Sequence, residues 1–201
     1  MVTKMRRRKV HLYVEGGNPS TKGPLSGQAR EAFAALFSTP EVQVVVKAHG
    51  GRDDTLDAFY LARNGKKHPP DEPVLLLIDA EGPVADIHKP WAHLKKCVEG
   101  VPDADVLLMV QVMETWMLAD PDALRAVFPH KLDLAKLPAP TANVEGLEKA
   151  HVYRSLEQAT RACSAPYGKS DHSFRVVAEL NPETLKKRLP SFKRAWDRIH
   201  R

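Results

Sequence analysis

The chain has little cysteine, and its spacing does not suit either structural use of that residue. Its 201 residues include only two cysteines, Cys97 and Cys163. They form no Cys-x-x-Cys pair of the kind found in zinc ribbons, and two distant cysteines do not make a disulfide framework. A reduced, cytoplasmic environment is therefore expected. A chain of this length can bury enough apolar surface to fold without such crosslinks.

Long apolar runs are also missing. No stretch reaches the roughly 18 residues that a membrane-spanning helix needs, and no apolar signal-peptide core follows the basic start of the chain. With 43% hydrophobic and 27% charged residues, the composition is ordinary for a globular protein. We expect one main domain, residues 9–128, with a helical and basic extension, residues 129–201, packed on it.

The stretch VEGGNPSTKG, residues 14–23, lacks the order of a phosphate-binding loop. It has paired glycines, two hydroxyls and a lysine after an apolar run. The Walker A pattern, however, places glycine directly before the lysine and Ser or Thr directly after it. Here the hydroxyls precede Lys22 and the glycine follows it. The stretch therefore does not predict a P-loop, and its acid, Glu15, becomes the residue of interest.

The net charge of +5 hides an uneven distribution along the chain. Residues 1–9 carry five basic groups and no acid, and residues 186–201 carry seven basic groups and one acid. The remaining stretch holds 18 basic and 24 acidic residues, a net charge of −6. An acidic body with basic ends fits a carboxylate-rich site flanked by a surface that attracts phosphate. The alternative is that these charges only serve solubility.

What the chain does contain is an alternation of short apolar runs and helical stretches. Four runs rich in Val, Ile and Leu are typical of parallel strands covered on both faces: 9–14, 42–47, 74–79 and 105–111. Apolar spacing and capping residues, among them Ser26 and Asp54, predict helices at 26–37, 55–63, 88–98, 115–119, 121–128 and 144–163, and prolines predict helix starts at 182 and 190. The predicted fold is α/β, a mostly parallel four-stranded sheet with helices on both faces and a helical C-terminal extension.

Acidic residues stand where predicted strands end. Glu15 ends the first strand, Asp79 and Glu81 end the third, and Glu114 follows the last. The carboxyl ends of parallel strands share one edge of the sheet, where ligands of such folds bind. Carboxylates gathered there raise each other's pKa, and a hard cation with oxygen ligands, Mg²⁺ or Mn²⁺, relieves this repulsion. Glycines after the acids let the backbone turn sharply. The alternative is that each acid is a helix N-cap or a solvated loop residue.

Four stretches, VEGG, LLLIDAEGPV, MVQVMETWMLADPDAL and YGKSDHS, resemble a family of small Toprim-like proteins often linked to phage defence. The resemblance spans about residues 9–200. Toprim domains also occur in topoisomerases, primases and nucleases of the overcoming-lysogenization-defect family. The resemblance implies a Rossmann-like fold, with Glu15 as general acid/base or metal ligand and with Asp79 and Glu81 as Mg²⁺ ligands. The sequence departs from the family in one respect, because the usual Asp-x-Asp ends here in Glu81.

Three further residues are candidates for the same site. Glu114 is either a ligand of a second metal, as in the nuclease branch of the family, or the cap of helix 115–119. Lys169 and His172, in PYGKSDHS, are expected near the scissile phosphate, because a cation there offsets charge that grows in the transition state. The alternative is that PYGKSDHS is an ordinary loop.

These features predict a Mg²⁺- or Mn²⁺-dependent nuclease that cleaves DNA or RNA phosphodiesters. The four acids would hold one or two metals, and Lys169 would be the electrostatic helper. The basic tail, including Lys186, Lys187 and Arg188, would bind the nucleic-acid backbone together with His172. One alternative is a non-catalytic partner of a separate ATPase, since the chain has no Walker motif of its own. Another is a nucleotidyl or phosphoryl transferase acting on small nucleotides.

Overall fold

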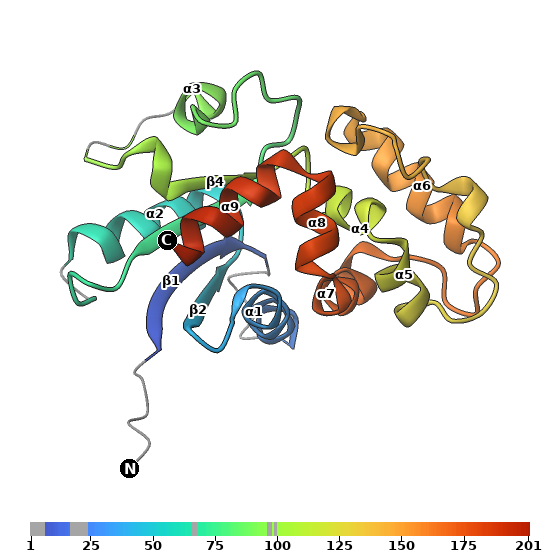
Figure 1. Cartoon of the computed structure of the whole chain (residues 1–201), viewed down its shortest axis with the longest axis horizontal. Coiled ribbons are helices and arrows are strands. Elements are labelled where there is room, and N and C mark those ends of the chain that lie inside the picture. Colours follow the sequence, from blue (N-terminus) through green and yellow to red (C-terminus); the bar gives the residue numbers. More distant parts are fainter. Residues whose placement is uncertain (1–6, 17–23, 66–67, 96–97, 99) are drawn as a thin grey trace, which may run out of the picture.

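A computed structural model describes residues 7–16, 24–65, 68–95, 98 and 100–201. The stretch 17–23, with most of the loop that fails the Walker A pattern, lies outside the described residues, as do Cys97 and the first six residues. Figure 1 shows a sheet with helices on both faces and further helices grouped beside it. Within the described residues, no helix combines the length and apolar character needed to cross a membrane.

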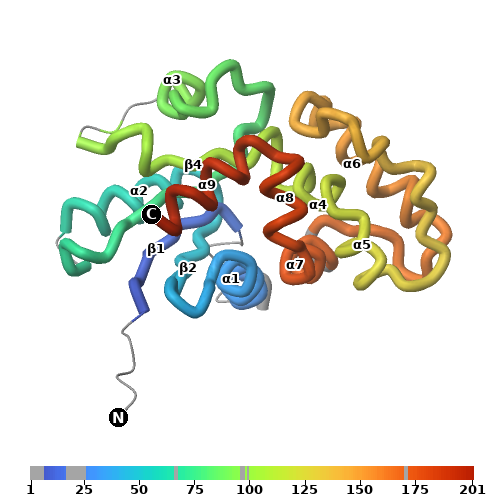
Figure 2. The backbone as a smooth tube through the Cα atoms, in the orientation of Figure 1, coloured from blue at the N-terminus to red at the C-terminus, as the bar shows by residue number. Residues whose placement is uncertain are grey.

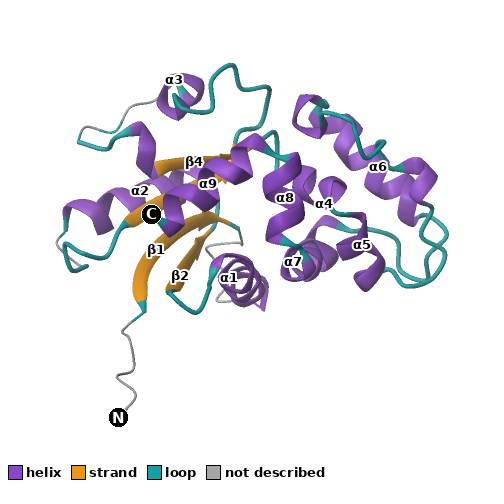
Figure 3. Ribbon diagram, in the orientation of Figure 1, coloured by secondary structure: helices purple, strands orange, loops and turns teal. Residues whose placement is uncertain are grey.

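Four parallel strands form the sheet, as predicted (Figure 3). They are β1 (Arg8–Glu15), β2 (Val42–His49), β3 (Val74–Asp79) and β4 (Val106–Met109), in the spatial order β2-β1-β3-β4. The register places Leu12 of β1 beside Val46 of β2 and Leu75 of β3. Every residue of β3 and β4 is buried, which is the pattern of parallel strands covered on both faces.

Alternate strand residues enter two hydrophobic clusters, one on each face of the sheet. On one face, Leu76 and Ile78 of β3 belong to the cluster of α2 (Arg52–Asn64) and α3 (Pro90–Leu94). On the other face, the neighbouring leucines of β3 belong to the cluster of α1 (Pro24–Phe37) and the C-terminal helices. The division follows from the two-residue period of a strand. It confirms the predicted sheet with helices on both faces.

Six α-helices lie in the described residues after β4: α4 (Glu114–Ala119), α5 (Pro121–Val127), α6 (Lys149–Thr160), α7 (Lys169–Glu179), α8 (Pro182–Arg188) and α9 (Pro190–His200). As predicted, α8 and α9 begin with proline, whose missing N–H costs nothing in a first turn. Trp116 of α4 is fully buried against the rings of Phe33, Phe37 and Phe192. The helix α7 packs beside α1 (Figure 2). The C-terminal helices therefore share one hydrophobic cluster with the sheet.

Three predicted elements are shorter than the sequence pattern indicated. The strand β4 ends at Met109 rather than at residue 111, because the chain there turns toward α4. The helix α3 ends early because Lys95 adopts a left-handed conformation with φ 50°. The predicted helix 144–163 is divided, since Leu147 is extended and separates the 3-10 turn Val144–Gly146 from α6.

The predicted helix starts also differ from those observed. The helix α2 begins at Arg52 after Gly51, so Asp54 lies inside the first turn, where its charge is favourable but does not cap. The N-cap of α4 is Met113, which makes the cap interpretation of Glu114 wrong. The loop interpretation of PYGKSDHS is also wrong in part, because Lys169 begins α7. The helix α1 begins at Pro24, two residues before Ser26.

Candidate metal centre

The structure places Glu15 and Asp79 at the topological switch point of the sheet. They are the last residues of β1 and β3, which are neighbours, with Val14 beside Leu77. After β1 the chain passes to the face covered by α1, and after β3 it passes to the opposite face, covered by α3. Ligands of open α/β sheets bind outside the carboxyl ends of two such strands.

Asp79 is a buried acid among other negative charges. Its Oδ1 accepts a hydrogen bond of 2.8 Å from the backbone N–H of Met113. Burial raises the pKa of Asp79 to about 8, and the neighbouring charges of Glu114 and Glu15 add to this effect. The Met113 hydrogen bond and the charge of Lys169 oppose it without cancelling it. The negative charge of this position is therefore poorly compensated by the residues that the structure describes.

Glu15 is in a similar situation. Burial raises the pKa of Glu15, and the negative charge of Glu81 raises it further. The positive charges of Arg52 and Lys169 lower this pKa but do not cancel the effect of burial. Its Oε2 is buried and has no hydrogen-bond partner among the residues that the structure describes. Arg52 is directed elsewhere, since its guanidinium donates a 2.6 Å hydrogen bond to the backbone carbonyl of Asp79. A carboxylate oxygen buried without a donor is one that a cation would stabilise.

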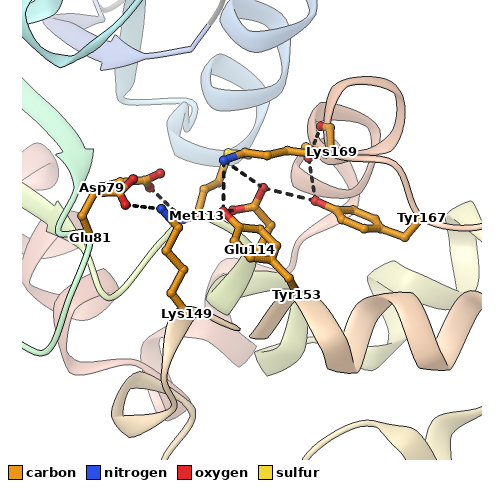
Figure 4. A network of polar contacts seen from close by, with 9 residues as sticks. Asp79, Glu81, Met113, Glu114, Lys149, Tyr153, Tyr167 and Lys169 are labelled. Atoms are coloured by element: carbon orange, nitrogen blue, oxygen red, sulfur yellow. Dashed lines mark hydrogen bonds and ion pairs between the residues drawn. The ribbon is translucent and has the colours of Figure 1, made fainter. Parts of the chain in front are cut away.

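Glu81 lies at the turn that leaves β3. It has φ 64°, a left-handed conformation that is costly for any residue other than glycine, and its N–H donates a 2.7 Å hydrogen bond to the carbonyl of Gln111. The expected turn therefore occurs at the acid itself and not at the following Gly82. The side chain of Glu81 is ion-paired with Lys149 of α6 (Figure 4).

Glu114 has no solvent exposure and is held by groups from α6, from α7 and from the loop just before α7 (Figure 4). The hydroxyls of Tyr153 and Tyr167 donate hydrogen bonds to its two oxygens, at 3.4 and 3.2 Å. The Nζ of Lys169 lies 4.0 Å from Oε1 of Glu114. The Tyr167 hydroxyl also lies 2.8 Å from Oγ of Ser173, a residue of α7, and this contact orients the phenol ring. This network ties α4 to α6 and α7.

Lys169 stands at the start of α7 with its ammonium group directed at the acids. It donates a 3.0 Å hydrogen bond to the Tyr153 hydroxyl. Burial lowers the pKa of Lys169, but the Tyr153 hydrogen bond and the charges of Glu114 and Asp79 outweigh it and raise the pKa above its ordinary value. Burial has the opposite effect on Tyr153 and raises the pKa of its phenol to about 12. Lys169 is therefore a permanent cation, held by a neutral phenol.

The four acids provide a set of oxygen ligands rather than a closed cage. Within the described part of the chain, no three of them bring donor atoms within 4.8 Å of one another. An ion would therefore be held by one or two carboxylates, which is how Mg²⁺ is usually bound, with waters and substrate phosphates as its other ligands. All-oxygen donors suit Mg²⁺ and Mn²⁺ rather than Zn²⁺ or copper. The orphaned oxygen of Glu15 and the raised pKa of Asp79 both fit such a cation.

The structure places His172 away from the position expected for a residue that contacts nucleic acid. Its side chain is buried, its Nδ1 accepts a 3.1 Å hydrogen bond from the N–H of Gly168, and its ring packs on Phe128. These contacts hold the first turn of α7, so His172 supports the helix that carries Lys169.

The three basic residues expected to bind nucleic acid lie at the end of α8 in different surroundings. Lys186 is ion-paired with Glu183 at 2.6 Å and lies over the ring of Trp196. Arg188 is half-buried, and its guanidinium donates hydrogen bonds to the carbonyls of residues 118, 119 and 139. Lys187 is exposed. Of the three, Lys187 is the one whose charge is directed to solvent.

Replacing Arg188 with alanine is expected to destabilise the fold by about 2 kcal/mol, since buried carbonyls would lose a charged donor. The matched variant Lys187→Ala, at the exposed neighbouring position, should change stability by less than about 0.5 kcal/mol. Urea unfolding of both variants measures the difference. Equal stabilities would show that the Arg188 contacts do not hold α8 in place.

Several residues of this site could not be found from the sequence. Arg52, Lys149 and Tyr153 belong to no motif, and they reach the acids only because their helices dock there. Tyr167 had a weak signal, since it stands two residues before Lys169 in YGKSDHS.

Comparison with known proteins identifies one family. The model of a family described as a domain of unknown function, DUF4276, matches residues 28–200, which is most of the chain. No curated protein and no solved structure matches the chain.

Proposed function

This chain belongs to the DUF4276 family, and we propose that it is a Toprim-like, Mg²⁺-dependent nuclease acting on nucleic-acid phosphodiesters. The observation that supports this most is the pairing of Glu15 and Asp79 at the switch point, where Asp79 has a pKa of about 8. Acids that repel one another at the ligand-binding edge of a sheet are a cost to folding, and a divalent cation offsets it.

Asp79 and Glu15 are the first candidates to hold the ion, with Glu114 and Glu81 as further carboxylates at the same edge. When bound, Mg²⁺ would polarise the phosphate and lower the pKa of a bound water. The backbone N–H of Met113 keeps the Asp79 carboxylate in a fixed orientation. Lys149, by pairing with Glu81, reduces the repulsion among the acids.

Lys169 is the proposed electrostatic catalyst. Its ammonium group is charged at all ordinary pH values and lies beside Glu114, with Tyr153 restricting its position. A cation fixed before the reaction stabilises charge that accumulates on phosphate oxygens in the transition state. The 4.0 Å distance between Nζ of Lys169 and Oε1 of Glu114 supports this role, because the charge would be close to an ion bound by Glu114.

The function is tested with metal-free protein and labelled single- and double-stranded DNA and RNA, with nucleoside triphosphates as the small-molecule alternative. Cleavage of a polynucleotide is expected with Mg²⁺ or Mn²⁺ and not with chelator. Lys169→Met should lower the cleavage rate by about 100-fold while Mn²⁺ affinity is unchanged or higher, because a competing cation is removed.

Lys136→Met, which removes an exposed lysine, is the matched control and should cleave at the wild-type rate. Nucleic-acid binding without cleavage by the wild type would favour a non-catalytic partner subunit. Turnover of free nucleotides alone would favour a transferase. Equal rates in wild type and Lys169→Met would contradict the role given to Lys169.

A further inference from the structure

A second cluster of ligand-type side chains lies at the other end of the sheet. His11 is in the first half of β1, beside Val74, the first residue of β3. His68 and Glu72 lie on the segment that leads into β3. The proposed Mg²⁺ site uses the carboxyl ends of the same two strands, so the two clusters are at opposite edges. This cluster plays no part in the proposed nuclease site.

The three side chains are in direct contact. The Nε2 of His11 lies 2.7 Å from Oε2 of Glu72, and both residues are more than nine-tenths buried. The ring of His68 stacks on that of His11, with 3.7 Å between the ring centroids. The Tyr13 hydroxyl lies 3.4 Å from Nε2 of His68, which helps to orient that imidazole. Donor atoms of the three residues all lie within 4.8 Å of one another.

The two ring nitrogens of His11 have different surroundings. The Nδ1 is buried and finds no hydrogen-bond partner among the described residues. The other nitrogen, Nε2, faces the Glu72 carboxylate, so it is the one through which His11 would bind an ion shared with Glu72.

Two imidazoles and one carboxylate form a donor set different from that of the acidic site. Two His and one Glu are the protein ligands of many zinc sites that keep a fourth position open. Imidazole suits Zn²⁺ and the neighbouring transition metals, whereas Mg²⁺ prefers oxygen alone. A cavity of about 450 Å³ is lined by His68 and Glu72 together with Arg63, Asp105 and Arg198, so a fourth ligand has access.

We infer that His11, His68 and Glu72 form a binding site for a divalent transition-metal ion, with Zn²⁺ as the best fit. Ligand atoms around a tetrahedral zinc are about 3.3 Å apart, and the donor atoms here lie within 4.8 Å of one another, so the widest pair would close by at most about 1.5 Å. The half-buried His68, on a segment without regular secondary structure, is the residue placed to make this movement. The bound ion would crosslink the segment that carries His68 and Glu72 to β1.

The test uses the full chain after removal of metal by chelation, titrated with Zn²⁺ by calorimetry and with Co²⁺ by visible absorption. Wild type is expected to bind one Zn²⁺ that excess Mg²⁺ does not displace, and to show the intense absorption of tetrahedral Co²⁺. His68→Ala should bind Zn²⁺ at least about 100-fold more weakly, because even outer-shell changes cost 10- to 100-fold. Zn²⁺ should also raise the Tm of wild type and not that of His68→Ala.

Two control variants distinguish Zn²⁺ binding at this site from Zn²⁺ binding by other residues. His130→Ala, at an exposed loop position, should bind Zn²⁺ like wild type. Asp79→Asn should also keep the Zn²⁺ site, so failure of the nuclease proposal would leave this inference intact. If His68→Ala does not fold, His68→Asn retains a polar side chain and replaces it in the comparison. Equal Zn²⁺ affinity in wild type and the folded His68 variant, or no saturable binding by wild type, would overturn the inference.

Discussion

Asp79→Asn should lose Mn²⁺ binding at the acidic site and nuclease activity together, each by at least about 100-fold. Asparagine keeps the shape of the side chain and can still accept the hydrogen bond from the N–H of Met113. It removes the negative charge, however, and an oxygen-liganded divalent ion depends on that charge. Because the geometry is conserved, a large effect would come from the lost anion and not from a disturbed turn.

The measurement is Mn²⁺ calorimetry and cleavage assays on wild type and Asp79→Asn. Asp133→Asn is the matched control, since Asp133 is exposed and caps the 3-10 turn Leu134–Lys136, where asparagine serves as well. Both the affinity for Mn²⁺ and the activity should be unchanged in that variant. If Asp79→Asn bound Mn²⁺ as tightly as wild type, Asp79 would be a structural acceptor for Met113 and the proposed metal site would be wrong.

Without metal, the free energy of unfolding of the wild type should fall as pH rises from about 4 to about 8. The pKa of Asp79 is raised in the folded protein from 3.8 to about 8, chiefly by burial, so the folded state binds a proton that the unfolded state has already released. Stability is therefore lost with rising pH in this window and changes no further above it. At about 1.4 kcal/mol for each pKa unit, the loss is at most about 6 kcal/mol.

Asp79→Asn has no such proton to lose, so the difference between the two proteins isolates this contribution. Metal-free Asp79→Asn should be similar to wild type near pH 4 and more stable by several kcal/mol near pH 8. Glu15, whose pKa is also raised by burial, acts in the same direction in both proteins. Urea unfolding with chelator, repeated from pH 4 to 9, gives the two curves. Parallel curves would mean that the pKa of Asp79 is not raised in the folded protein.

Metal binding should show the complementary pH dependence. An ion that binds ionised Asp79 must displace its proton below about pH 8. The affinity of wild type for Mn²⁺ is therefore expected to rise by up to about tenfold for each pH unit between 6 and 8 and then to level off.

The acids of the site could be predicted from the sequence because their placement depends on local patterns. The runs that became β1 and β3 are short, apolar and parallel, and parallel strands present their carboxyl ends at one edge. Glu15 and Asp79 stand directly at those ends, although 64 positions separate them in the chain. The length and apolar content of these runs, with the rule of right-handed crossovers, were enough for this step.

The partners of Glu81 and Glu114 were decided by the packing of the C-terminal helices. Trp116 and Phe192 fill the face of the sheet next to α1, and this packing sets where α6 and α7 lie. Only then do Tyr153 and Lys169 meet Glu114. Amphipathic spacing predicts that a helix buries one face, but it does not specify the neighbour or the direction in which the polar residues at its ends point.

The same limit explains why the histidine cluster has no counterpart in the sequence analysis. Zinc motifs are recognised when their ligands are close in the chain, as in Cys-x-x-Cys. His11 lies on a strand and His68 on a segment 57 positions later, and they stack only because the chain crosses the sheet to place β3 beside β1. The sequence by itself determined the class of fold and the edge where its acids gather, since both follow from short apolar runs, the helical stretches between them and the acids that stand where the runs end. The tertiary structure decided which distant side chains compensate those acids and which form the second cluster, because these contacts depend on helix docking and strand order.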